Sequence, residues 1–285
     1  MEKHPLNFST PCAEQHATLV RYATYADDRP PRRLLLLHGA GVAGEVTWTY
    51  LANYLTEWDE VLIPDFAGMG KSRFSGTFAP RVADYVRQIE ELLSAIDWQV
   101  FDVAGYSFGG MITARLYEQN IASGLCFLME PAMLFSSDCG QIRRKADDYL
   151  SVADAVDDNP DNESAYFAFL DSVSPARARD ERTDQLTIAR IKANAQGFAA
   201  ALRAVSQVLL EECATFSSWI PSYPGMSFVG DLSHATMQGR HRLLAEQAGD
   251  WGFELVPNAD HSLVFTKPRF IAKAMNERKR QISAD

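Results

Sequence analysis

A serine stands between two glycines in the stretch Gly105-Tyr106-Ser107-Phe108-Gly109, which follows the pattern Gly-x-Ser-x-Gly. Residues 100–104 before it have the apolar character of a strand, and residues 111–117 after it follow a helical pattern. A sharp turn from strand to helix lifts a serine hydroxyl clear of the sheet edge. The glycines are needed because a Cβ at either one would clash where helix and strand pack together. This setting predicts that Ser107 is a nucleophile and not part of a simple small-residue turn.

A serine hydroxyl is a weak nucleophile at neutral pH and needs an adjacent base. His261 is the best candidate, because it lies in a loop after the last expected strand and late in the chain. This position matches the chain order Ser…acid…His that one hydrolase architecture uses. Histidines 4 and 16 precede the sheet, whereas His234 and His241 lie beside or within an expected surface helix and are expected to be solvated.

Two carboxylates could orient the imidazole of His261, and both satisfy the chain order. Glu130 follows the expected strand 125–129 and precedes a proline, whereas Asp231 follows Gly230 at the end of a later strand. Burying a carboxylate without a partner is costly, so a glutamate at a strand end favours a functional role. We therefore prefer Glu130 as the third member, with Asp231 as the alternative. A purely structural carboxylate at the hinge of an inserted segment is the simpler interpretation of Glu130.

The elements around these residues predict an α/β fold. Apolar runs at 34–37 and 60–64 are typical of strands buried on both faces, and residues 85–96 have helical spacing. The strand–helix succession predicts a mostly parallel central sheet with helices on both faces. From about 135 to 219 the patterns are helical without a convincing strand. We therefore predict a core formed by residues 1–134 and 220–285, with an inserted helical cap at 135–219.

Composition limits the class of protein. The chain has 285 residues, 47% of them hydrophobic, and a formal net charge of −10. Such an acidic chain repels nucleic acid and anionic membranes, so we expect neither as a partner. No signal-peptide core is present, and no apolar run approaches the roughly 20 residues that a membrane span requires. We therefore expect a cytoplasmic protein.

The four cysteines lie at positions 12, 126, 139 and 213, far apart and without metal-binding spacing. We expect reduced thiols, as is usual in the cytoplasm, with Cys126 as a small core residue. No metal site is implied.

These motifs together resemble those of the α/β-hydrolases, in their capped, esterase-like branch. The resemblance covers nearly the whole chain outside the cap and includes His38-Gly39-Ala40-Gly41 and Asp65-x-x-Gly68-x-Gly70-x-Ser72, each after a buried strand. It implies that the backbone amides of Ala40 and Phe108 form the oxyanion hole. The family usually places its aspartate where this chain has Ser233. Some haloalkane dehalogenases of this fold instead take their acid from the strand end that corresponds to Glu130. A serine nucleophile suits acyl transfer, whereas dehalogenases and epoxide hydrolases of this fold need a carboxylate there.

The sequence thus predicts a carboxylesterase-like serine hydrolase that cleaves a small carboxylic ester or related acyl bond through an acyl-enzyme, without a cofactor. Thioesters, lactones and carbon–carbon bonds next to a ketone stay open as substrates, and so does the oligomeric state. A non-hydrolytic receptor on the same fold is the main alternative. A dinucleotide-dependent oxidoreductase is a weaker one. Residues 39–44 match Gly-x-Gly-x-x-Gly and Asp65 ends the next strand, but His38 precedes the first glycine and hydride transfer would not need Ser107 or His261.

Overall fold

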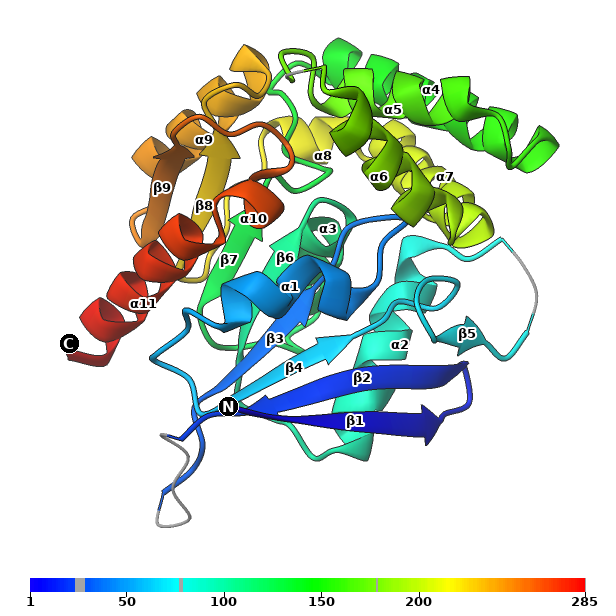
Figure 1. Cartoon of the computed structure of the whole chain (residues 1–285). Coiled ribbons are helices and arrows are strands. Elements are labelled where there is room, and N and C mark those ends of the chain that lie inside the picture. Colours follow the sequence, from blue (N-terminus) through cyan, green and yellow to red (C-terminus); the bar gives the residue numbers. More distant parts are fainter. Residues whose placement is uncertain (24–28, 77–78, 178, 285) are drawn as a thin grey trace.

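The structure is a computed structural model that describes residues 1–23, 29–76, 79–177 and 179–284. Within these residues a nine-stranded sheet has the order β1-β2-β4-β3-β6-β7-β8-β9, with β5 paired to β2 (Figure 1). The pairs that involve β1, β2 or β5 are antiparallel, and those from β4 to β9 are parallel. The strands are β1 Glu2–Ser9, β2 Ala13–Arg21, β3 Arg33–Leu37, β4 Glu60–Pro64, β5 Arg73–Phe74, β6 Asp102–Tyr106, β7 Cys126–Met129, β8 Gly225–Gly230 and β9 Trp251–Val256. The predicted mostly parallel α/β sheet is confirmed.

The sequence patterns missed β1, which is the antiparallel edge of the sheet. Its burial alternates weakly, from exposed to half-buried, so no apolar run marks it. Strand β1 pairs with β2 from Glu2 opposite Arg21 to Ser9 opposite Glu14. The local sequence carries no signal for this pairing.

Helices cover both faces of the sheet. On one face, the helices are α2 Val82–Ala95, α3 Phe108–Glu118 and α9 Ala235–Gln247. On the other, they are α1 Gly44–Ala52, α10 Leu263–Thr266 and α11 Pro268–Ala284 (Figure 1). Each face has its own buried apolar cluster, because the strands are buried on both sides. The periodic residues of α2, including Tyr85, Ile89 and Leu92, all point into the first cluster.

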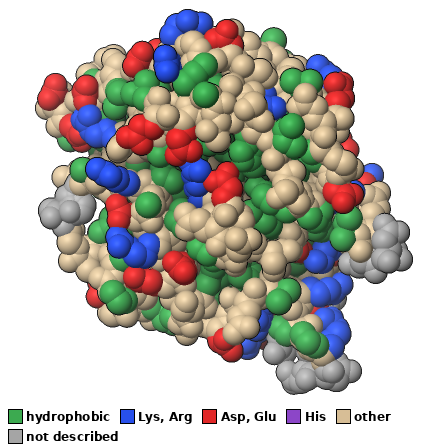
Figure 2. Space-filling model, turned by 180° about the vertical axis from the view of Figure 1, so that it is seen from behind, with side chains coloured by type: hydrophobic (Ala, Val, Ile, Leu, Met, Phe, Trp, Pro, Cys, Tyr) green, Lys and Arg blue, Asp and Glu red, His purple; other side chains and the backbone are tan. Residues whose placement is uncertain are grey.

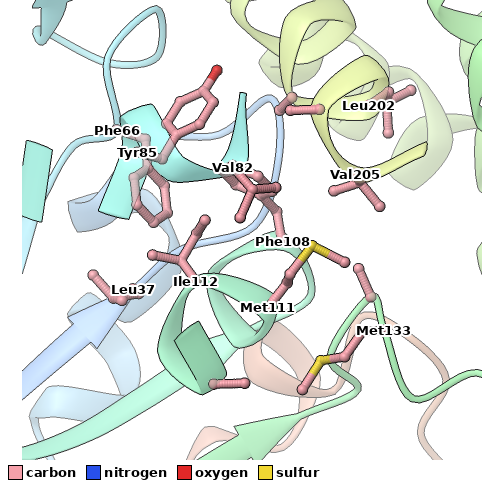
Figure 3. Packing of buried hydrophobic residues seen from close by; sticks show 14 of the residues in the cluster. Leu37, Phe66, Val82, Tyr85, Phe108, Met111, Ile112, Met133, Leu202 and Val205 are labelled. Carbon is pink, nitrogen blue, oxygen red and sulfur yellow. The ribbon is translucent and has the colours of Figure 1, made fainter. Parts of the chain in front are cut away.

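Among the described residues, five helices lie between β7 and β8, in the region where the sequence predicts an insertion. They are α4 Cys139–Asp158, α5 Glu163–Val173, α6 Glu181–Lys192, α7 Ala195–Glu211 and α8 Cys213–Ser217. Figure 1 shows them above the carboxyl ends of the strands. Figure 3 shows Leu202 and Val205 of α7 facing Met111 of α3 and Val82 of α2. The inserted helices and the sheet therefore share one continuous apolar cluster.

The expectation of reduced thiols is wrong for two of the four cysteines. Cys139 and Cys213 form a disulfide across a sequence separation of 74 residues, with a Cα–Cα distance of 5.2 Å. The pairing arises because α4 packs along α7 and so reaches the start of α8. Cys126 is fully buried in β7, as predicted, and both it and Cys12 are free thiols.

Figure 2 shows acidic and basic side chains interspersed over one face of the molecule. Among the helices of the described residues, none has the length and apolarity that crossing a membrane would require.

Candidate active site

Ser107 occupies a strained turn between β6 and α3. Its φ of 52° and ψ of −113° are unusual for a residue other than glycine, and such a conformation costs about 1–3 kcal/mol. Hydrogen bonds hold it in place: its amide donates to the Met129 carbonyl, and its carbonyl accepts from the Ala132 amide, each at 3.0 Å. The predicted role of the flanking glycines is confirmed. A Cβ on Gly109 would lie 2.3 Å from the Leu37 carbonyl oxygen, and one on Gly105 would lie 2.2 Å from Thr113 Oγ1.

His261 lies beside Ser107 although 154 residues separate them. Its Nε2 is 3.1 Å from Ser107 Oγ. The residue before the serine helps to hold it, because the Tyr106 hydroxyl donates to the His261 carbonyl at 2.9 Å and the two rings are 5.1 Å apart. The His261 side chain is 10% exposed, so it is largely shielded from solvent.

Glu130 is the carboxylate that contacts His261. Its Oε2 lies 2.7 Å from His261 Nδ1, and its side chain is fully buried. Oε1 accepts from the Gly230 amide at 2.8 Å and from Ser233 Oγ at 2.5 Å. A positive φ of 43° at Glu130 directs the side chain toward these donors. Both carboxylate oxygens are therefore engaged, which compensates for removing the charge from water.

Asp231, the alternative acid, lies elsewhere. It is exposed, and its Oδ1 accepts from the Ala259 amide at 3.2 Å. Ser233 occupies the position where the family usually has an aspartate. It contributes to the site as a hydrogen-bond donor to Glu130. The structure thus brings Ser107, His261 and Glu130 together and leaves Asp231 out.

The expectation that His241 is solvated is wrong. It lies on the face of α9 that packs on the sheet, fully buried and 6.2 Å from the Phe253 ring. Burial lowers its pKa to about 3, and nearby Arg240 acts in the same direction, so the ring is neutral. His234 is also half-shielded, since its Nε2 lies 2.9 Å from the Ser172 carbonyl.

The amides of Ala40 and Phe108 are free to serve a ligand. Neither donates a hydrogen bond to another described residue. Phe108 is the first residue of α3, where backbone amides have no intrahelical partner. Its ring is fixed against Phe66 and Tyr85, at 5.1 Å and 4.9 Å (Figure 3).

The loop that carries Ala40 is fixed by its neighbours. His38 is fully buried, with Nδ1 2.7 Å from the Gly39 carbonyl and Nε2 accepting from the Phe66 amide at 2.8 Å. Burial lowers the pKa of His38, so it stays neutral. Asp65 accepts from the Gly44 amide at 2.7 Å and from the Lys71 amide at 2.9 Å. Its carboxylate thus already occupies the start of α1, where a dinucleotide phosphate would bind.

A cavity of about 190 Å³ adjoins Ser107 and His261. Its apolar wall comes from α5 and α6 and from the loops of the sheet, with lining side chains Val42, Phe169, Leu170, Val173, Ile191 and Phe265. The polar lining residues of α6 are Thr183, Thr187 and Arg190. Of the aromatic run 166–170, Phe169 and Leu170 line this cavity.

Hydrogen bonds anchor the wall to the loops beneath it. The Ser172 carbonyl, near the end of α5, accepts hydrogen bonds from His234 Nε2 and, at 2.6 Å, from Lys145 Nζ. After α6, Asn194 donates to the Gly41 carbonyl at 3.1 Å and accepts from the Gly70 amide at 2.9 Å. These contacts were not predictable from local sequence, because each joins segments that are distant in the chain.

No group of three or more potential metal ligands occurs within the part of the chain that the structure describes. The groups that meet at this site are a hydroxyl, an imidazole, a carboxylate and two backbone amides without a partner among the described residues.

Comparison with known proteins agrees with this architecture. Residues 34–274 match the Alpha/beta hydrolase family, so the chain belongs to that family. This membership supports a hydrolase.

Solved structures share the fold at low identity. An esterase from Exiguobacterium antarcticum is 15% identical with a TM-score of 0.71, over 94% of this chain and 96% of that one. A protein from Pseudomonas aeruginosa, provisionally assigned as an epoxide hydrolase, is 17% identical with a TM-score of 0.73, over 98% and 97%. A thermophilic esterase from Thermogutta terrifontis is 18% identical with a TM-score of 0.70, over 99% of each chain. No curated protein matches this sequence significantly.

Proposed function

We propose that this protein is a serine hydrolase that cleaves a small carboxylic ester through an acyl-enzyme. The observation that carries the proposal is the continuous series of contacts from Ser107 Oγ through His261 to the buried Glu130, at 3.1 Å and 2.7 Å. A buried, fully engaged carboxylate behind an imidazole is the arrangement that makes a serine nucleophilic. The esterases among the structural neighbours have the same fold.

In the first half-reaction, Ser107 Oγ attacks the ester carbonyl while His261 Nε2 takes its proton. Glu130 holds the Nδ1 proton and stabilises the imidazolium. The amides of Ala40 and Phe108 bind the oxyanion of the tetrahedral intermediate, each contributing about 3 kcal/mol in a dry site. His261 then protonates the alcohol oxygen, which leaves, and the acyl group stays on Ser107.

In the second half-reaction, water attacks the acyl-enzyme. His261 takes a proton from the water, and the second tetrahedral intermediate collapses to the carboxylic acid as Ser107 recovers its proton. A carboxylate nucleophile, which alkyl attack on an epoxide would need, is not part of this proposal, because residue 107 is serine. We further propose that the inserted helices act as a cap, since α5 and α6 form one wall of the cavity next to Ser107.

The test is turnover of short p-nitrophenyl esters together with labelling by a serine-directed phosphonate. The expected result is hydrolysis and one adduct on Ser107, identified by mass spectrometry of peptides, with both lost in Ser107→Ala. Tight binding of a small ligand without turnover or adduct would instead favour the receptor alternative. Labelling at a different serine would contradict the proposed nucleophile.

A further inference from the structure

We propose that the substrate of this site carries a negatively charged group, and that Arg190 on α6 binds it. The simplest such substrate is a half ester of a short dicarboxylic acid, with one carboxyl esterified and the other free. This inference rests on the proposed ester hydrolysis and adds a class of substrate to it.

Arg190 is the only Asp, Glu, Lys or Arg among the described residues that line the cavity. Its positive charge is therefore not compensated inside the cavity. Asp260, which precedes the lining segment 261–266, is already engaged, because its Oδ1 accepts from the amide and the hydroxyl of Ser262.

Arg190 is exposed, as is Arg182 on the same helix, which likewise has no hydrogen bond or ion pair to the described residues, and Arg190 differs from it in lining the cavity. Arg177 pairs with Asp171 and Asp184, and Lys192, two residues after Arg190, pairs with Asp161. The Arg190 side chain has no hydrogen bond or ion pair to any of the described residues, in a chain with ten more acidic than basic residues. A guanidinium offers a planar pair of donors that matches a carboxylate, so it is available to a ligand.

The backbone that carries Arg190 is anchored close to the reacting groups. Ile191, the next residue, approaches the Gly41 position so closely that a Cβ there would be 2.8 Å from Ile191 Cγ2. Asn194 binds the Gly41 carbonyl, one residue from Ala40. The segment of α6 that carries Arg190 is thus held against the loop that carries Ala40.

The shape of the cavity limits the rest of the substrate. The cavity has a volume of about 190 Å³. The part of the lining that α5 supplies is apolar, from Phe169, Leu170 and Val173. A short methylene chain between an ester and a carboxylate fits these surroundings, whereas a long acyl chain does not.

The sharpest test compares two esters that differ only in charge. Monoethyl glutarate carries a carboxylate, and the ethyl ester of glutaric acid monoamide replaces it with a neutral carboxamide of nearly the same size. We expect the wild-type kcat/KM to favour the charged ester by about twofold to fivefold, as for one ion pair at an exposed arginine. The difference should lie in KM, and it should shrink as salt screens the pair.

Variants on one helix provide the control. Arg190→Gln should bring the kcat/KM ratio of the two esters close to one. Arg190→Lys should give an intermediate ratio, because the planar pair of guanidinium donors is lost but the positive charge is kept. Arg182→Gln changes an exposed arginine on the same helix that does not line the cavity, so it should leave the ratio unchanged. A wild-type ratio near one, or a ratio that survives Arg190→Gln, would overturn the inference.

Binding separates this inference from the proposed reaction. In Ser107→Ala, calorimetry should show monoethyl glutarate bound more tightly than the amide, and the additional Arg190→Gln change should remove the difference. If wild-type protein hydrolyses neither ester while this binding difference is found, ester hydrolysis fails and the anion site stands. If both esters are hydrolysed equally, ester hydrolysis stands and the anion site fails.

Discussion

The two sides of the cavity are built differently. On the side of the sheet, every side chain of the proposed triad has at least one partner with a defined role: Ser107 meets His261, and Glu130 meets His261, Gly230 and Ser233. On the side of α5 and α6, the lining is partly apolar and partly polar, and its one charged residue, Arg190, has no partner among the described residues. The first side holds a fixed geometry for one reaction, whereas the second leaves room for a ligand to supply the missing contacts. Substitutions on the two sides should therefore differ in kind: the first should lower kcat, and the second should change which substrate is preferred.

The largest effect on turnover is expected from Glu130→Gln. An amide cannot hold the imidazole in the same tautomer or stabilise its charged form, so kcat should fall by about 10⁴, as for the corresponding change in a protease triad. The measurement is steady-state hydrolysis of a p-nitrophenyl ester, with folding checked by circular dichroism. Asp231→Asn is the matched control, because that carboxylate contacts the Ala259 amide and not His261. It should lose no more than a few-fold, and a larger loss than for Glu130→Gln would exchange the two assignments.

A smaller loss is expected from Ser233→Ala. The change removes one of the two donors to Glu130 Oε1 and leaves the Gly230 amide. A hydrogen bond to a charged group contributes about 1.5–3 kcal/mol, so losing half of that in the transition state lowers kcat by roughly tenfold, with KM unchanged. Ser206→Ala is the control: this serine is also buried, but its hydroxyl donates to the Leu202 carbonyl within α7. A KM effect without a kcat effect would mean that Ser233 does not act through Glu130.

On the opposite wall, Val173→Ala should alter selectivity more than rate. The shortened side chain enlarges the cavity, and a methylene in an apolar pocket is worth about 1–3 kcal/mol. The ratio of kcat/KM for hexanoate over butyrate esters should therefore rise by about tenfold. Val156→Ala makes the same change at a buried position of α4 that does not line the cavity. An equal change in both variants would indicate general loosening of the inserted helices instead of pocket enlargement.

Much of the fold could be predicted from the sequence because its signals are local. The buried run 60–64 corresponds to β4 with the same bounds, and the periodicity of residues 85–96 corresponds to α2 within a few residues. The turn at Ser107 was recognisable from the two glycines around the serine. In the structure, the carbonyl of Leu37 and the side chain of Thr113 approach these glycines so closely that neither position has room for a Cβ. Strand β1 was not recognisable, because an exposed edge strand lacks an apolar run.

The candidate site was predictable to the extent that its residues follow strand ends. Glu130 and His261 were chosen from chain order and burial, and the structure places them in contact with each other. The contacts that hold them were not predictable. Tyr106 reaches a carbonyl 155 residues away, and Ser233 reaches a carboxylate 103 residues away. Such partners are created by tertiary packing, and a single sequence carries no local pattern for them. The same is true of the cysteine pair that joins α4 to α8.

The smallest effect on turnover is expected when that disulfide is removed. It lies at the start of α4 and α8, away from the residues that line the cavity, so Cys139→Ser with Cys213→Ser should leave kcat nearly unchanged at 25 °C. Stability should fall, because a crosslink across 74 residues restricts the unfolded chain by about 4 kcal/mol in the chain-entropy treatment. The measurement is the thermal midpoint of the wild type with and without reductant, beside that of the double variant.

Cys12→Ser is the control, because it changes a partly exposed free thiol and should leave the response to reductant intact. Cys126→Ser is not suitable, because that thiol is fully buried in the sheet. If reductant does not shift the wild-type midpoint, the pair does not form in solution, and the wall of α5 and α6 depends on packing and on the anchors at Ser172 and Asn194 alone.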